Sequence, residues 1–220
     1  KDGLDRIELW KHSIMTSILA RRIATLVKYP NPERAFLAGL LHDIGKIMFD
    51  GKFHEEYKAV ISEVKEGRGL IEEMERRFLG MDHAELAGKV LLSWNFPEAI
   101  RDAICFQNHE LDGILNLKGK DHPLIAICIA ANTLAEMLNV SHVGFEEYRS
   151  LDSRIVPFIN KEGALTPDAL CSGLIEEYRD LEGILLMNAS SSITWQSPHG
   201  VEAPGERLAI VGGHPLASAV

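Results

Sequence analysis

The sequence has few cysteines, no long apolar run and no excess of basic residues. The three cysteines lie far apart and form no Cys-x-x-Cys pair, which argues against a disulfide scaffold, a zinc knuckle or a redox pair. The longest apolar run, residues 124–131, is far shorter than the about 20 residues of a transmembrane helix. With 23 basic and 32 acidic side chains, the net charge is −9. We therefore expect no nucleic-acid partner and no docking on an anionic membrane.

The remaining composition is that of an ordinary globular domain. Of 220 residues, 46% are hydrophobic and 25% are charged, so the chain can bury a core without disulfides. Cys105, Cys128 and Cys171 lie in apolar surroundings, and we expect three buried thiols in a reducing, cytoplasmic environment. The chain shows no signal peptide and begins at Lys1 rather than Met, so we expect a fragment of a longer protein.

Helical periodicity dominates the chain up to residue 187. Apolar residues recur near every 3.6 positions from Leu4 to Val27, and Asn31 with Pro32 predicts the start of an apolar, central helix that carries residues 35–46. No sustained alternation typical of a strand precedes residue 190, so the fold class is predicted to be all-α. Further helices are predicted over residues 54–64, 70–78 with a solvated face at 71–77, 82–93, 97–108, 121–138 and 166–187, with a loop over 112–120.

The last part of the chain differs from the rest. Serine, proline and glycine residues interrupt any helical pattern after Met187. We therefore predict a helical domain over residues 1–187 and a short irregular tail or linker over residues 188–220.

Four histidines and one aspartate stand out on the predicted helices. Burying a His-Asp pair in so apolar a helix is costly unless the carboxylate is paired or binds a metal. Imidazole and carboxylate without thiolate suit Fe, Mn, Co, Ni or Zn. The alternative is that Asp43 pairs with Lys46 while His42 fills a polar slot. The candidate residues are His12, His42, Asp43, His83 and His109.

These residues carry a resemblance to a known family. Residues 9–13 (LWKHS) and 40–46 (LLHDIGK) resemble the HD superfamily of metal-dependent phosphohydrolases. Residues 35–46, 80–88 (GMDHAELAG) and 92–97 (LSWNFP) are similar to the HDOD (HD-related output domain) signalling family. The match covers about residues 8–140 and implies an HD-like helical bundle. It also implies a divalent transition metal held by His12, His42, Asp43, His83 and His109.

Three departures from the family pattern stand beside the match. HD phosphodiesterases of the HD-GYP type have a His-His pair where this chain has Asn108-His109, and the superfamily's last ligand, an aspartate, corresponds to Asn132. HDOD domains also carry a helical N-terminal half before the Trp-Lys-His motif, and this chain starts almost at that motif. We expect a partly degraded site that binds metal weakly or not at all, because fewer ligands would fix the ion.

Two functions compete on these grounds. The family resemblance implies a bacterial signal-transduction module that acts through protein partners or fused receiver, cyclic-dinucleotide or sensor domains. The alternative is a phosphohydrolase acting on a nucleotide or cyclic nucleotide, with Asp43 and Lys46 as catalytic residues. A third reading is a structural bundle without metal. We lean against an enzyme, and we expect self-association if a missing N-terminal half leaves apolar surface exposed. Residues predicted to line or orient the site are Glu85, Glu110, Asn108 and Asn132.

Overall fold

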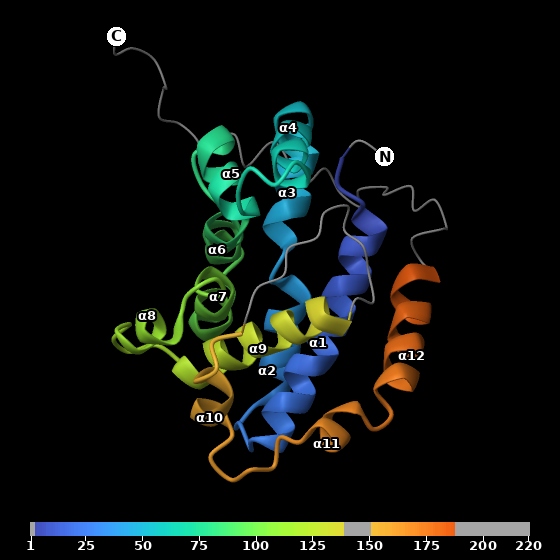
Figure 1. Cartoon of the computed structure of the whole chain (residues 1–220), viewed down its shortest axis with the longest axis vertical. Coiled ribbons are helices and arrows are strands. Elements are labelled where there is room, and N and C mark those ends of the chain that lie inside the picture. The colour runs from blue at the N-terminus through green and yellow to red at the C-terminus, as the bar shows by residue number, and fades with distance from the viewer. Residues whose placement is uncertain (1–2, 139–150, 188–220) are drawn as a thin grey trace, which may run out of the picture. The chain divides into compact units, whose positions relative to one another are not determined.

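The computed structural model describes residues 3–138 and 151–187, and within these ranges the chain forms twelve α-helices and no strand (Figure 1). The predicted all-α class is confirmed. None of these helices is long and apolar enough to cross a membrane. The helices are α1 (Arg6–Leu26), α2 (Pro32–Leu41), α3 (Ile44–Lys52), α4 (His54–Lys65), α5 (Ile71–Leu79), α6 (His83–Ser93), α7 (Glu98–Cys105), α8 (Leu111–Leu115), α9 (His122–Leu138), α10 (Ile155–Ile159), α11 (Pro167–Cys171) and α12 (Leu174–Met187).

Helices α1 and α2 pack along each other and start where the capping residues predict. The side chain of Asn31 accepts a hydrogen bond from the backbone N–H of Arg34, and Pro32 occupies the first turn of α2. Gly39 lies so close to α1 that a Cβ atom there would stand 2.9 Å from Cα of Ser17. The absence of a side chain at this position therefore permits the close contact between the two helices.

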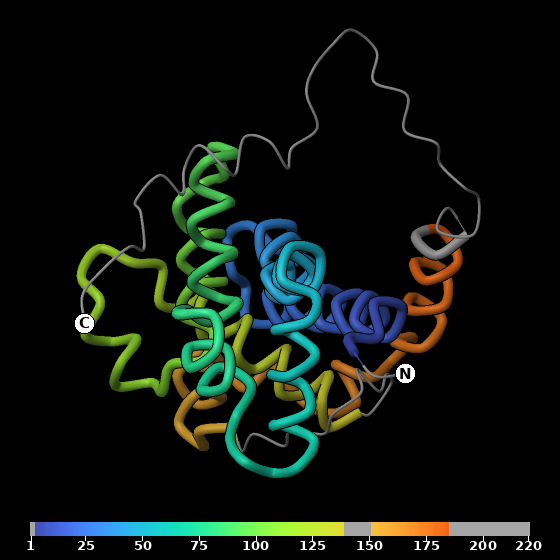
Figure 2. Tube along the Cα trace, turned by 90° about the horizontal axis from the view of Figure 1, so that it is seen from above, coloured from blue at the N-terminus to red at the C-terminus, as the bar shows by residue number. Residues whose placement is uncertain are grey.

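Helix α9 crosses α1 and α2 and contacts both (Figures 1 and 2). Residues 124–131 of α9 are all buried, as expected of a helix that is apolar on every side. They join α1, α2, α6 and α7 in the larger of two hydrophobic clusters.

A smaller cluster forms where α3, α4 and α5 meet. It is built around Phe49, Tyr57 and Ile61, all nearly inaccessible to solvent. Because α2 belongs to the larger cluster and α3 contributes Phe49 to the smaller one, the α2–α3 junction at residues 42–43 connects the two.

Several elements differ from those predicted. The helix expected through residue 46 breaks at His42 and Asp43, and the helix expected after Thr166 breaks at residues 172–173, where Arg22 donates to the carbonyl oxygens of Leu170 and Ser172. Helix α8 occupies part of the predicted loop, α10 was not foreseen, and α7 ends at residue 105 rather than 108. These features depend on contacts between distant segments, which local periodicity does not report.

The thiols also differ from expectation. Cys128 is buried in α9, Cys105 is partly buried and Cys171 is exposed. Burial raises the pKa of the Cys128 thiol to about 12. The expectation of three buried thiols is therefore wrong for Cys171.

Residues up to Gly183 form one compact unit, the first of the two into which the chain divides. All the contacts discussed below lie within the first unit. The tail predicted over residues 188–220 lies outside the described residues, so the domain boundary at residue 187 stays a prediction.

Candidate metal centre

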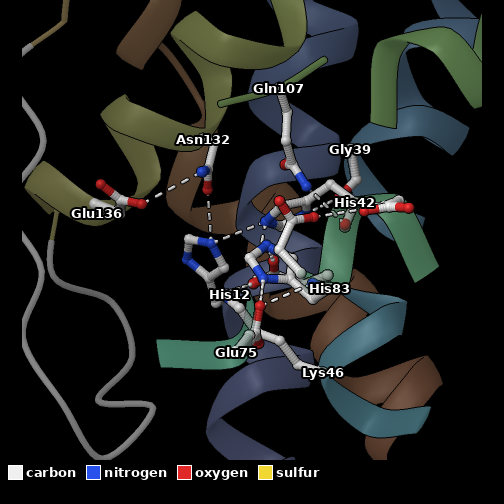
Figure 3. Close-up of polar contacts among 12 residues, drawn as sticks. His12, Gly39, His42, Lys46, Glu75, His83, Gln107, Asn132 and Glu136 are labelled. Atoms are coloured by element: carbon white, nitrogen blue, oxygen red, sulfur yellow. Dashed lines mark hydrogen bonds and ion pairs between the residues drawn. The ribbon is translucent and has the colours of Figure 1, made fainter. Parts of the chain in front are cut away.

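The break between α2 and α3 turns His42 and Asp43 toward the same space. Neighbouring side chains of a continuous helix point about 100° apart. At the break, the His42 Nδ1–H donates to the carbonyl oxygen of Gly39 at 2.8 Å (Figure 3). That bond leaves Nε2 of His42 to face the Asp43 carboxylate, whose Oδ2 lies 3.3 Å away. The interruption of the helix thus brings the side chains of His42 and Asp43 together.

Helix α1 adds His12 to this pair. The Nε2 atoms of His12 and His42 are 3.2 Å apart, and the ligand atoms of His12, His42 and Asp43 all lie within 4.8 Å of one another. All three side chains are buried. Two imidazole nitrogens and a carboxylate form a donor set that suits a divalent transition metal.

His83 approaches Asp43 from the start of α6. Its Nε2 lies 3.4 Å from Oδ1 of Asp43. This approach needs a glycine at position 45, because a Cβ atom there would stand 2.0 Å from the carbonyl oxygen of His83. The close packing of α3 against α6 therefore places a fourth donor beside Asp43, next to the group of three whose ligand atoms all lie within 4.8 Å of one another.

Glu75 of α5 fixes the orientation of His83. Its Oε2 accepts hydrogen bonds from Nδ1 and from the backbone N–H of His83, each at 2.7 Å. Its Oε1 accepts from the hydroxyl of Tyr57 at 2.8 Å. With Nδ1 protonated, the lone pair of His83 Nε2 faces Asp43, which is the arrangement that a metal-binding histidine requires.

Glu75 was missed in the sequence because it lies in the Glu/Arg-rich stretch predicted to be solvated. That prediction is wrong for Glu75, which is 0% exposed, and for Glu72, which is 4% exposed. Glu75 lies one helical turn after the apolar Ile71, and Glu72 lies one turn before Glu75. This helical spacing is the signal that could have marked both positions as buried. Three donors compensate for the burial of the Glu75 carboxylate.

Asn132 lies where α9 passes His12. Its Oδ1 is 2.8 Å from His12 Nε2, and its Nδ2 donates to Oε1 of Glu136 at 3.3 Å. The bond to Glu136 orients the amide so that its oxygen faces His12. The residue predicted to replace the last acidic ligand therefore stands beside the cluster and brings no charge to it.

The charge of the cluster rests on Asp43. Burial alone would raise the pKa of this carboxyl, but His42, Lys46 and His83 outweigh that effect and hold the pKa well below its usual value. Lys46 Nζ is 2.9 Å from Oδ2 of Asp43. Burial, and then the neighbouring His42, lower the pKa of His12 to about 3, so this imidazole is neutral at physiological pH.

Gln107 is a further residue that no sequence pattern singled out. Its Nε2 donates to the backbone carbonyl of His42 at 2.9 Å, and its side chain is buried. The residue thus holds the α2–α3 junction from the segment that follows α7.

The structure does not bring all the predicted site residues together. His109 is exposed, lies beyond the end of α7 rather than on a helix, and places its ring 5.1 Å from that of Phe106. Glu85 is exposed and pairs with Lys89 at 2.8 Å, and Glu110 is also exposed. Asn108 and His109 line a cavity that Asn132 also reaches. The residues that converge are His12, His42, Asp43, Lys46, His83 and Asn132.

The donor chemistry of the cluster fits a divalent transition metal. His12, His42, Asp43 and His83 would hold the ion, with Gly39 and Glu75 fixing two of the imidazoles. A metal at such a site acidifies a bound water and polarises an ester oxygen. In the described part of the chain, Asp43 is the only carboxylate within the group of converging ligand atoms, and Lys46 already neutralises it.

Comparisons with solved structures find the same fold in other proteins. The chain is similar in structure to an HDOD domain protein of unknown function from Geobacter sulfurreducens, with 23% identity, a TM-score of 0.68, and coverage of 84% of this chain and 65% of that one. It is also similar to a candidate phosphohydrolase from Shewanella amazonensis (23% identity, TM-score 0.56, 82% and 62% covered). A third similar structure is the response regulator MmoQ from Methylococcus capsulatus (21% identity, TM-score 0.55, 77% and 61% covered).

At these identities the structural matches show the fold alone, and the chain spans less than two thirds of each of the three solved chains. A search of the curated proteins found no match. The family model of the HDOD domain matches residues 1–110, half of the chain and most of the region that builds the His-Asp cluster. The chain therefore belongs to the HDOD domain family.

Proposed function

We propose that this chain is a bacterial signal-transduction module whose HD-type metal site is partly degraded. In this account the helical domain works in the cytoplasm and transmits its state to a protein partner or a fused signalling domain. Similarity to a response regulator and to an HDOD domain protein supports this proposal. Self-association of the domain belongs to the same proposal.

The observation that carries the proposal is the amide of Asn132 beside His12. An aspartate at this position would add a second negative charge to a site in which Lys46 already offsets the charge of Asp43. Without that aspartate, a divalent cation would be bound mainly by neutral donors in a buried site, where uncompensated charge is costly. We therefore expect weak metal binding and no efficient activation of water.

A metal-dependent phosphohydrolase is the second candidate. The observation that favours it is the convergence of His12, His42, Asp43 and His83 with a lysine at the same place. In that case Asp43 would position the attacking water and Lys46 would steady a phosphate of a nucleotide substrate. The similarity to a candidate phosphohydrolase is compatible with this function.

An activity assay with a designed gain of function separates the two candidates. The wild-type chain and the Asn108→His/Asn132→Asp double variant are compared on bis(p-nitrophenyl) phosphate with Mn²⁺, and the His42→Asn/Asp43→Asn variant measures the background. The proposal predicts no metal-dependent turnover by the wild type and measurable turnover by the double variant. Robust turnover by the wild type that is lost in His42→Asn/Asp43→Asn would overturn it in favour of the enzyme.

A further inference from the structure

The three histidines of the cluster are held through different ring nitrogens. His42 donates through Nδ1 to the carbonyl oxygen of Gly39, and His83 donates through Nδ1 to the carboxylate of Glu75. In both rings, Nε2 is thereby left to face the cluster. His12 makes its contacts through Nε2 itself, which lies 3.2 Å from Nε2 of His42 and is also hydrogen-bonded to the side chain of Asn132 from α9 (Figure 3).

The orientation of the Asn132 amide decides which partner carries the proton in that bond. Its Nδ2 donates to Oε1 of Glu136 at 3.3 Å, and its Oδ1 lies 2.8 Å from Nε2 of His12. The reverse orientation would place the amide oxygen against a carboxylate, and two acceptors repel each other. Because an amide oxygen only accepts, the proton of the 2.8 Å bond lies on Nε2 of His12, whether the ring is neutral or charged.

A proton on Nε2 has a consequence for the metal site. The nitrogen then has no lone pair to offer an ion. His12 must therefore release this proton, to its own Nδ1 or to water, and give up its bond to Asn132 before Nε2 can act as a ligand. Glu136 follows Asn132 by four positions on α9, so both residues lie on one side of the helix.

We propose that Asn132, oriented by Glu136, keeps Nε2 of His12 protonated and so withholds this histidine from metal binding. The amide does more than omit a charged ligand, because it also stabilises the form of His12 that cannot bind an ion. Asn132 and Glu136 are positioning residues, since both act through His12. This inference rests on the proposed function, for which it supplies a second cause of weak metal binding.

Imidazole NMR of the metal-free protein tests the hydrogen bond. Spectra are recorded on the full chain with ¹⁵N-labelled histidine in EDTA, and the His12→Gln variant identifies the signals of His12. We expect a protonated Nε2 with a downfield N–H signal in the wild type. Asn132→Leu nearly keeps the volume of the side chain and removes the acceptor. In this variant the N–H signal should move upfield and exchange with water about fivefold faster, the effect of losing one ordinary hydrogen bond.

Two further variants separate the role of the amide from general effects on α9. Thr133→Val is the matched control, because Thr133 is buried and its hydroxyl donates to the backbone carbonyl of Ile129 at 3.0 Å. It should leave the His12 signal unchanged. Glu136→Gln allows the Asn132 amide to turn over, since a glutamine amide can donate as well as accept. Its His12 signal should move in the same direction as in Asn132→Leu, by a smaller amount.

Zn²⁺ affinity provides a second readout. Zn²⁺ is the probe because it prefers imidazole and carboxylate ligands, whereas Mn²⁺ also suits carbonyl oxygens. We expect Asn132→Leu to bind Zn²⁺ about fivefold more tightly than the wild type or Thr133→Val, although the substitution adds no ligand, because no hydrogen bond to position 132 has to be broken. The His42→Asn/Asp43→Asn variant gives the background of unspecific binding.

The results that would overturn the inference are specific. They are an Nε2 lone pair on His12 in the metal-free wild type, an unchanged His12 signal in Asn132→Leu, or Zn²⁺ binding by Asn132→Leu that is equal to or weaker than that of the wild type. An unchanged signal in Glu136→Gln would overturn the role of Glu136. The NMR measurements need no metal, so they decide the question even if no variant binds Zn²⁺.

Failure of this inference is distinguishable from failure of the proposed function. Asn132→Asp tests the missing charge, and Asn132→Leu tests the hydrogen bond. Tighter metal binding in the aspartate variant alone would leave the degraded site standing and overturn the role of the hydrogen bond. Tighter binding in the leucine variant alone would do the reverse.

Discussion

Glu75 carries the buried charge that orients His83. We predict that Glu75→Gln weakens metal binding about 10- to 100-fold, as is typical when the partner of a metal-bound histidine is lost. The amide no longer favours the Nδ1–H form of His83, so the Nε2 lone pair no longer faces Asp43 reliably. Titration of the purified protein with Mn²⁺ measures the affinity, and ¹⁵N chemical shifts report the tautomer of His83.

Tyr57→Phe is the matched control for this variant. It removes the third hydrogen bond to Glu75 and keeps both bonds to His83. We expect a cost in the free energy of unfolding of about 1 kcal/mol and little change in the His83 tautomer. Equal effects of the two variants on metal affinity would show that Glu75 acts through packing rather than through His83.

The three thiols should differ sharply in reactivity. Cys171 is exposed, whereas Cys128 is buried and its thiol has a pKa raised to about 12, so it remains protonated at pH 8. We predict that a thiol reagent labels Cys171 first and leaves Cys128 unmodified until the protein unfolds. Peptide mass spectrometry after timed labelling identifies the sites, and fast labelling of Cys128 in the folded protein would contradict the described packing of α9.

Single residues differed in how far the sequence could predict them. The His-Asp dipeptide was conspicuous because a polar pair in an apolar helix demands a partner, and Asn132 was marked by its place in the family pattern. Glu75 and Gln107 were not found, because each acts through a contact made by a distant segment. Glu85 and Glu110 follow the predicted histidines in sequence, yet the structure leaves both exposed.

At the scale of elements, the contact between α3 and α6 depends on Gly45. We predict that Gly45→Ala destabilises the protein by about 1–3 kcal/mol, the usual cost of overpacking, because the new methyl group would overlap the carbonyl of His83. The shift should also move His83 away from Asp43. Urea denaturation measures the first effect, and the NMR signals of His83 report the second.

Gly51→Ala, in the same helix, provides the control for Gly45→Ala. Nothing lies within 4 Å of a Cβ atom at Gly51. The substitution should therefore stabilise the protein by about 0.5–1 kcal/mol, the usual advantage of alanine over glycine in a helix. If both alanine variants were equally tolerated, the close approach of α3 and α6 would not exist in solution.

Helix α12 is tied to α1 by an ion pair that should respond to pH. Glu177 accepts hydrogen bonds from Arg21 and from Nε of Arg22, the latter at 2.6 Å. Partial burial alone would raise the pKa of Glu177, but the two arginines outweigh it and the pKa is lowered below 4.5. A lowered pKa means that the stabilisation is present above pH 4.5 and is lost as the pH falls through the lower, folded-state value.

We predict that Glu177→Gln lowers the free energy of unfolding by about 1 kcal/mol at pH 7, a modest value because the pair is partly exposed to solvent. The difference from wild type should shrink as the pH is lowered below 4.5, where the native glutamate becomes protonated. Urea denaturation at pH 7 and at progressively lower pH measures this change. If the difference in the free energy of unfolding stayed constant over this pH range, the charge of Glu177 would not be the source of the stabilisation.

Elements with strong local signals were predicted well. Asn31 with Pro32, Asp82, and Thr166 with Pro167 all cap helices in the structure. The break between α2 and α3 was not foreseen, because the apolar pattern continues on both sides of the His42-Asp43 pair and no proline interrupts it. What favours the break is the convergence of His42 and Asp43 with residues of α1 and α6, which no local pattern contains.

At the scale of the whole molecule, the cluster lies between two hydrophobic cores. The larger core supplies the helix of His12, and the smaller core supplies Tyr57, whose hydroxyl reaches Glu75. A metal ion bound in the cluster would therefore stabilise the contact between the two cores, because the cluster links residues from both. Under the proposed function, this coupling would let metal binding influence a partner without catalysis.

The most direct test of the account is the metal affinity of the wild type against Asn132→Asp. Elemental analysis after dialysis and Mn²⁺ titration are made on both, with His42→Asn/Asp43→Asn as the background. Asn116→Asp adds the same charge at an exposed position and serves as the control.

We predict substoichiometric metal in the wild type and at least about tenfold tighter binding, or 1.4 kcal/mol, in Asn132→Asp, with no gain in Asn116→Asp. A full equivalent of metal retained by the wild type, with no gain on introducing the aspartate, would contradict the degraded site.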